Sequence, residues 1–127
     1  MKNFQLLPFL AKHATALITV CLIAVSIHTF SFYLENGLGL AYNDARSHLD
    51  IGRRVVEGLN VGAAQLGSVW LPLTHVLMGL TIWNDFMWHS GLAGALWSMI
   101  AFVGTGLLIY FFLKELGASM LARVVAV

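Results

Sequence analysis

The sequence predicts an all-α membrane protein with two transmembrane helices, the start of a third, and amphipathic juxtamembrane helices in the first outer loop. Of its 127 residues, 59% are hydrophobic and only 10% are charged. A soluble domain carries about 45–50% apolar and about 25% charged residues. Two uncharged stretches are each long enough to cross a bilayer, and five of the six acidic residues lie in the segment between them. These observations favour lipid as the surrounding of most of the chain.

The charge balance and the cysteine content exclude several kinds of function. Seven basic residues against six acidic ones give a net charge of +1. A nucleic-acid partner is not expected, because such a protein needs a basic stripe to neutralise phosphates. The single cysteine, Cys21, excludes an intrachain disulfide and a cysteine-based zinc site.

The first predicted span covers residues 14–34, which carry no formal charge and are flanked by Lys12 and Glu35. Their number matches a membrane-crossing helix. A cleaved signal peptide is the alternative, but its apolar core would be only about 7–15 residues long and would end in small residues. Here the stretch ends in bulky side chains, Phe30 and Tyr33 among them, which favours a permanent span.

The second predicted span covers residues 91–113, which are uncharged and end before Lys114. Its first half is rich in small residues, which let a neighbouring helix approach closely. These small residues are Gly91, Ala93, Gly94, Ala95 and Ser98. After a Leu-Gly turn, residues 118–127 begin a third span without completing it. We therefore expect residues 1–127 to be the N-terminal transmembrane part of a larger protein.

A third apolar stretch, residues 66–83, contains Pro72 near its centre. With only two crossings, four of the seven basic residues share the side of the N-terminus, and the positive-inside bias then places that side in the cytoplasm. These four residues are Lys2, Lys12, Lys114 and Arg123. We therefore interpret residues 66–83 as a hairpin or re-entrant segment within an outer loop, residues 35–90.

The outer loop is predicted to contain an amphipathic helix over residues 43–59. Asn43 and Asp44 favour a helix start, and the apolar residues that follow recur at spacings of three and four. These apolar residues are Ala45, Leu49, Gly52, Val56 and Leu59. The opposite face carries oppositely charged pairs four residues apart, namely Arg46–Asp50, Asp50–Arg54 and Arg53–Glu57. Such a helix suits a membrane surface.

The first turn of this helix holds the candidate site. Asp44 and His48 are four residues apart, so both side chains are expected on one face. A carboxylate beside an imidazole can act as a general base with an orienting partner, or supply two ligands to a divalent cation. The alternative is a helix cap with an exposed pair. We expect His75 to bond a backbone carbonyl freed by Pro72, and His89 to lie in an interfacial aromatic belt.

Two strings in the loop carry a resemblance. Residues 44–49 read Asp-Ala-Arg-Ser-His-Leu, and residues 65–73 read Gln-Leu-Gly-Ser-Val-Trp-Leu-Pro-Leu. In order and spacing they resemble the first outer loop of GT-C fold membrane glycosyltransferases, a group that includes protein O-mannosyltransferases and aminoarabinose transferases. The resemblance covers nearly the whole chain and is strongest to uncharacterised prokaryotic members.

The resemblance implies a function and a set of roles. The family transfers a sugar from a polyprenyl-phosphate carrier to an acceptor on the outer side of the membrane. Asp44 stands where the family has the acidic residue that takes the proton from the attacking hydroxyl or binds a metal ion. Arg46, Arg53 or Arg54 would contact the donor phosphate, a group that guanidinium binds well. For Arg53 and Arg54 the alternative is ion pairs on the helix surface and contact with anionic lipid. Residues His48 and His75 complete the expected substrate-binding set.

The expected partners are a polyprenyl-phosphate-linked sugar donor, membrane lipid, and the remainder of the enzyme or partner helices. The sequence pattern requires no cofactor. The one candidate that it suggests is a divalent metal ion bound by Asp44 and His48. Asn43 stands where many relatives have a second acidic residue, which counts against a bridged metal. The expected location is the prokaryotic cytoplasmic membrane. A fragment of this kind is expected to be inactive alone.

A different class of function stays open on the sequence. A small non-catalytic membrane protein would pack against a partner through Gly91, Gly94 and Ser98. An ion or proton pathway lined by His28, Asp44 and His75 is weaker, because neither predicted span contains an acidic residue.

Overall fold

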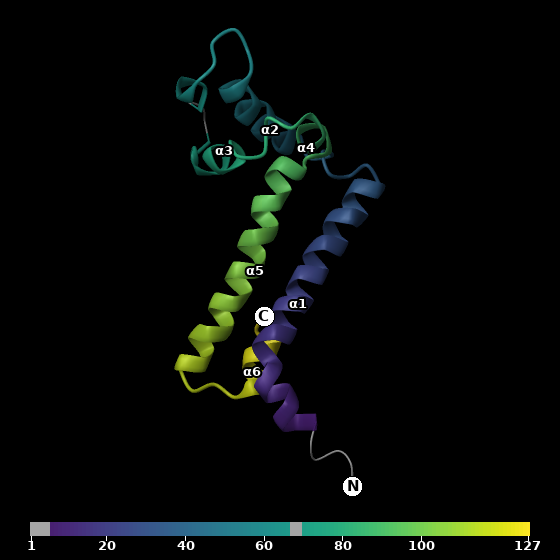
Figure 1. The fold of residues 1–127 in the computed structure, drawn as a ribbon, viewed down its shortest axis with the longest axis vertical. Helices are drawn as coiled ribbons and strands as arrows, with labels where there is room; N and C mark the ends of the chain where they lie inside the picture. Colours follow the sequence, from purple (N-terminus) through teal and green to yellow (C-terminus); the bar gives the residue numbers. More distant parts are fainter. Residues whose placement is uncertain (1–5, 67–69) are drawn as a thin grey trace. The chain divides into compact units, whose positions relative to one another are not determined.

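The computed structural model describes residues 6–66 and 70–127, and the elements in these ranges are all helical (Figure 1). This agrees with the predicted all-α class. The α-helices and the single 3₁₀ helix, η1, are α1 (Leu6–Glu35), α2 (Asn43–Val56), η1 (Ala63–Leu66), α3 (Leu73–Met78), α4 (Asp85–Ser90), α5 (Leu92–Glu115) and α6 (Met120–Val125).

Helices α1 and α5 are long and apolar enough to span a membrane. The 24 residues of α5 extend for about 36 Å at about 1.5 Å per residue, which exceeds the hydrocarbon thickness of about 30 Å. Both helices are apolar on all sides, and large side chains such as Val20, Leu108 and Phe112 are more than 60% exposed. A helix of this kind is either the core of a large protein or a membrane span, and here it is not buried.

The chain forms two compact units, which we call unit 1 (residues 1–27 and 100–127) and unit 2 (residues 28–99). In unit 1, α1 packs against α5 where Leu22 meets Gly106. A Cβ atom at Gly106 would lie 2.7 Å from Leu22 Cδ1 and 3.1 Å from a methyl group of Val127. Glycine is therefore what permits this close approach.

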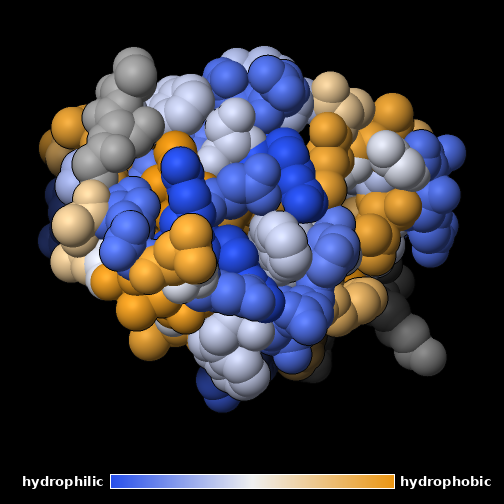
Figure 2. Space-filling view, turned by 90° about the horizontal axis from the view of Figure 1, so that it is seen from above, coloured by the Kyte–Doolittle hydropathy of each residue, from blue (hydrophilic) through white to orange (hydrophobic). Residues whose placement is uncertain are grey.

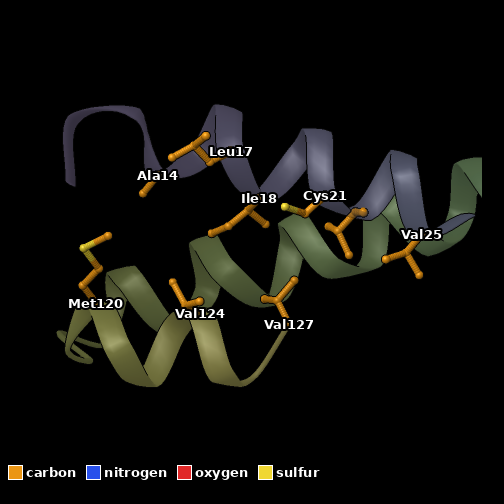
Figure 3. A pocket seen from close by; sticks show the side chains of 9 residues that line it. Ala14, Leu17, Ile18, Cys21, Val25, Met120, Val124 and Val127 are labelled. Atoms are coloured by element: carbon orange, nitrogen blue, oxygen red, sulfur yellow. The ribbon is translucent and has the colours of Figure 1, made fainter. Parts of the chain in front are cut away.

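Helix α6 also belongs to unit 1. Ser119 caps it by accepting a hydrogen bond from the backbone N–H of Ala122, and Arg123 lies over the ring of the buried Tyr110. An open apolar groove of about 420 Å³ runs between α1 and the end of the chain (Figure 3), and Cys21 is among the residues that line it. The segment predicted to start a third span thus forms a six-residue helix, too short to cross a bilayer by itself.

Unit 2 contains the segment that connects α1 to α5 together with the adjoining turns of these two helices. Helix α2 packs against η1 and α3, and Figure 1 shows α3 and α4 beside the start of α5. The buried core joins α2, α3, the segment after α3, and α5, and consists of Leu49, Met78, Ile82 and Ala93. Leu40, Met87, Trp88 and Trp97 pack around it.

The small residues at the start of α5 are used inside this unit. Ala93 is fully buried in the core, and a Cβ atom at Gly94 would lie 3.3 Å from Met78 Sδ. Thr81 Oγ1 donates a hydrogen bond of 2.9 Å to the carbonyl of Ala93. Close approach at these positions therefore serves packing against the connecting segment of the same chain.

The start of α2 at Asn43 agrees with the predicted helix, whereas its cap and its end differ. The residue that caps α2 is Tyr42, whose backbone is extended and whose side chain makes no capping bond, so the predicted capping role of Asn43 is wrong. The helix ends at Val56 instead of residue 59. Gly58 follows with φ +143°, a conformation that L side chains rarely adopt, and Leu59 is fully exposed instead of on the buried face.

The 66–83 stretch is not one continuous helix. Pro72 is the residue that precedes α3, α3 itself ends at Met78, and turns carry the chain to Asn84. Residues 67–69 of this stretch lie outside the described ranges. The described part is broken where proline and short turns interrupt the helical hydrogen bonds.

Candidate functional site

Polar side chains gather on unit 2, over the short helices α2 to α4. Figure 2 shows this face from above, with hydrophilic residues grouped beside hydrophobic ones. The first two turns of α2 supply four of the polar side chains, Asp44, Arg46, His48 and Asp50, and each of them is partly buried. This face brings together most of the residues that the sequence singled out.

Asp44 lies in the first turn of α2, near the positive end of the helix dipole. Its Oδ2 accepts a hydrogen bond of 2.7 Å from the hydroxyl of Tyr42. That hydrogen bond, together with the negative charge of Asp44, raises the pKa of Tyr42. The phenol therefore stays protonated at neutral pH and holds one carboxylate oxygen, and the other, Oδ1, has no side-chain donor among the described residues.

His48 is paired with His75 and not with Asp44. The Nδ1 atom of His48 lies 2.8 Å from Nε2 of His75, and the two rings stack with their centroids 5.0 Å apart. The ring of Trp70 packs on His48 at 4.7 Å. In the described part of the chain no hydrogen bond joins Asp44 to His48, so the expected pair shares a helix without being hydrogen-bonded.

His75 is only 1% exposed, and its Nδ1 atom has no hydrogen-bond partner in the described residues. The prediction that His75 bonds a nearby carbonyl is therefore wrong. Burial lowers the pKa of His75, and the charge of a protonated His48 would lower it further. His75 is accordingly a neutral imidazole at pH 7.

Arg46 lies beside the indole of Trp88. Its Nε atom is 3.3 Å from Asp50 Oδ1, and its guanidinium carbon is 4.9 Å from the ring centroid of Trp88. Trp88 Nε1 in turn donates to Asp50 Oδ1 at 3.2 Å. The side chain of Arg46 is still 38% exposed, so it has room to bind an anion.

Arg53 is used inside the protein. Its guanidinium donates to the carbonyls of Ile82 and Trp83 at 2.9 and 3.0 Å, and it forms ion pairs with Glu57 and Asp85. Burial lowers the pKa of Arg53, but the hydrogen bonds to the two carboxylates outweigh that effect and raise it. Arg53 fastens α2 to the segment before α4 and has little capacity left for a ligand.

Arg54, the next residue, is exposed on α2. The predicted pair with Asp50 is not among the ion pairs of the described residues, where Arg46 holds that carboxylate. Of the three arginines expected to contact a phosphate, Arg54 and Arg46 are accessible, whereas the guanidinium of Arg53 is engaged.

Among the described residues, no three side chains of the His, Cys, Asp or Glu type lie close enough together to hold a metal ion. His89 is separate from the histidine pair, because its Nδ1 lies 2.8 Å from the carbonyl of Asp85 and its ring packs on Trp88. A metal bound at Asp44 and His48 would need further ligands.

Sequence reasoning missed Tyr42, Trp70 and Trp88 as parts of this site. The approach of His48 to His75 also had no local signal, because 27 residues separate them. The position of Tyr42 two residues before the carboxylate was the one available hint.

Comparison of the chain with protein-family models, with curated proteins and with solved structures gave no match.

Proposed function

We propose that the chain is the N-terminal portion of a polyprenyl-phosphate-sugar-dependent glycosyltransferase in a prokaryotic cytoplasmic membrane. In this proposal α1 and α5 cross the membrane, the N-terminus is cytoplasmic, and residues 35–90 lie outside. Two long apolar helices that flank a polar, folded loop support this arrangement. The resemblance of the strings at residues 44–49 and 65–73 gives the reaction class.

The observation that carries the proposal is the environment of Asp44. One oxygen is held by Tyr42, and the other has no side-chain donor among the described residues. A carboxylate oriented in this way is suited to accept the proton of an acceptor hydroxyl. The hydroxyl oxygen forms a bond to the anomeric carbon, the bond from that carbon to the phosphate oxygen breaks, and polyprenyl phosphate leaves.

Arg46 and Arg54 are the proposed phosphate contacts. Both are on α2, and both guanidinium groups are accessible. A guanidinium binds two oxygens of a phosphate at once and balances the charge on the leaving group. Arg53 keeps α2 in place through its internal bonds and takes no direct part.

Replacing Asp44 by Asn tests the proposal. The amide still accepts the hydrogen bond from Tyr42 but cannot act as a base. In membranes that contain the complete gene product and undecaprenyl-phosphate donors with radiolabelled sugars, transfer should fall by about 10²–10⁴-fold. The matched control is Glu35→Gln, which removes an exposed carboxylate at the end of α1 and should leave transfer unchanged. Full activity of Asp44→Asn would overturn the proposal.

The proposed topology has its own test. In a Cys21→Ser background, single cysteines replace Asn60, in the loop, and Glu115, at the end of α5; both sites are exposed. A membrane-impermeant maleimide should label Asn60→Cys in intact cells and Glu115→Cys only after the membrane is opened. Labelling of both sites in intact cells would contradict two crossings of the bilayer.

The alternative of a non-catalytic protein that packs through its small residues is less well supported. Gly94 is covered by Met78, and Gly91 ends α4 with φ +81° against the side chain of Leu40. Of the three residues expected to form a partner surface, only Ser98 is exposed.

A further inference from the structure

The two imidazoles that join α2 to α3 hold a buried nitrogen without a partner. His75 Nδ1 is inaccessible to solvent and makes no hydrogen bond among the described residues, while Nε2 of the same ring lies 2.8 Å from His48 Nδ1. Neither the general base nor the proposed phosphate contacts account for this arrangement. The contact between the two rings, together with the unpaired Nδ1 of His75, determines which ring nitrogens carry protons.

The distance between the two nitrogens requires one proton between them. A neutral His75 carries a single ring proton. If His48 Nδ1–H were the donor, the proton of His75 would be on Nδ1, where a buried N–H would have no acceptor, at a substantial cost. If His75 Nε2–H is the donor, Nδ1 keeps only a lone pair, which is the less costly group to leave unpaired.

We propose that His75 is a positioning residue: its Nε2–H donates to His48 Nδ1 and fixes His48 in the tautomer that carries its proton on Nε2. The partly exposed ring of His48 therefore presents an N–H donor one helical turn after Asp44. This N–H donates a hydrogen bond to the phosphate of the sugar carrier, a role that rests on the proposed function. Asp44 is then left as the base, because neither nitrogen of His48 is free to take a proton.

Nitrogen NMR tests the protonation pattern directly in the intact chain. The protein is labelled with ¹⁵N-histidine and purified in detergent micelles, and long-range ¹H–¹⁵N correlation spectra separate protonated ring nitrogens from bare ones. His48→Gln and His75→Gln assign the signals. Both rings should carry the proton on Nε2. A proton on Nδ1 of either His48 or His75 in the native protein would overturn the inference.

Two substitutions at His75 separate positioning from packing. His75→Gln keeps an N–H donor near the position of the imidazole Nε2, whereas His75→Leu fills similar space without a donor. His48 should keep its Nε2–H tautomer in His75→Gln and become a mixture of both tautomers in His75→Leu. An unchanged tautomer in a folded His75→Leu protein would contradict the role of His75. If that variant does not fold, the native spectrum still decides.

The activity assay separates this inference from the proposed function. With undecaprenyl-phosphate donors, His75→Leu should raise the KM for the donor about twofold, because only the fraction of His48 that carries its proton on Nε2 can donate to the phosphate, and leave kcat nearly unchanged. His75→Gln should restore the native KM. If no transfer occurs with any variant, the proposed function fails while the tautomer result stands. If His48 carries its proton on Nδ1, the positioning role of His75 is rejected whatever the activity.

Discussion

Units 1 and 2 each contain part of the long helices α1 and α5, yet the interactions that stabilise unit 1 differ from those that stabilise unit 2. In unit 1 the side-chain hydrogen bonds of the described residues are local, such as Thr19 to the carbonyl of Thr15. In unit 2, side-chain hydrogen bonds join residues far apart in sequence, such as Trp88 to Asp50, 38 positions apart.

The difference follows from what each helix can do alone. A long apolar helix makes its backbone hydrogen bonds internally, so close packing of side chains is enough to pair it with a neighbouring helix. Helices α3 and α4 have six residues each, far below the length of about 12–15 residues at which isolated helices become stable in water. Their positions depend on tertiary contacts, and a few residues therefore control the geometry of the candidate site.

The aromatic residues allow the two units to be followed separately. All four tryptophans lie in unit 2, at positions 70, 83, 88 and 97, and Tyr110 is the one tyrosine in unit 1. Tryptophan fluorescence during unfolding in mixed micelles therefore reports on unit 2.

The largest expected effect on stability is at Ile82, the largest fully buried side chain. Ile82→Ala should destabilise unit 2 by about 3 kcal/mol, the usual cost of truncating a buried aliphatic residue. Leu80→Ala, two positions earlier and 69% exposed, should change stability by less than about 0.5 kcal/mol. Equal effects in fluorescence-monitored unfolding would contradict the described core.

The adjacent arginines are expected to give a difference of similar size. Arg53→Met removes the donors to two carbonyls and should cost about 3 kcal/mol, since hydrogen bonds to charged groups contribute about 1.5–3 kcal/mol each. The ion pairs add little, because the carboxylates of Glu57 and Asp85 are well exposed. Arg54→Met should be nearly neutral. A stable Arg53→Met protein would show that α2 is held by apolar packing alone.

Unit 1 offers a matched pair of glycines. Gly106→Ala forces the end of the Leu22 side chain to move and should leave the protein about 1 kcal/mol less stable than Gly104→Ala, because nothing lies within 4 Å of a Cβ added at Gly104. Hydrogen exchange of peptides covering residues 100–127 measures the difference, and tryptophan fluorescence should not change. Similar exchange in the two variants would rule out the contact between Leu22 and Gly106.

The smallest effect is a pH dependence. Because the pKa of His75 is lowered in the folded protein from its ordinary value of 6.5, only the unfolded state takes up a proton just below that pH. The contribution of neutral His75 to the free energy of unfolding is complete above about pH 6.5 and decreases as the pH falls toward the pKa of His75 in the folded protein. Unfolding monitored between pH 7.5 and 5 should show this loss in the native protein and less of it in His75→Gln. Identical slopes would exclude His75 as its source.

Features that depend on neighbouring residues could be predicted from the sequence, and those that depend on distant ones could not. The two long helices follow from uncharged runs, and the Arg46–Asp50 and Arg53–Glu57 pairs follow from a spacing of four. The end of α2 was misjudged, because the apolar spacing continues past Gly58 while the backbone does not. In the candidate site, the placement of Asp44 and Arg46 in the first turn of α2 follows from local pattern.

His75 was recognised as a polar residue in an apolar stretch, but its partner was not, since only tertiary packing brings α3 to His48. The carbonyls that bind Arg53 carry no sequence signal at all, because every residue has one.

The hydrogen bonds of Arg53 also determine when α2 can be fixed in place during synthesis of the chain. Its partners Ile82, Trp83 and Asp85 are made 29 to 32 residues later, which at about 5–20 residues per second is a delay of about 2–6 s. During that interval α2 has left the ribosome with Leu49 and Ile51 uncovered, while α1 is already complete. Lengthening the exposed segment between Glu57 and Val61 would extend this interval and leave the finished contacts intact, since loop closure depends only weakly on length.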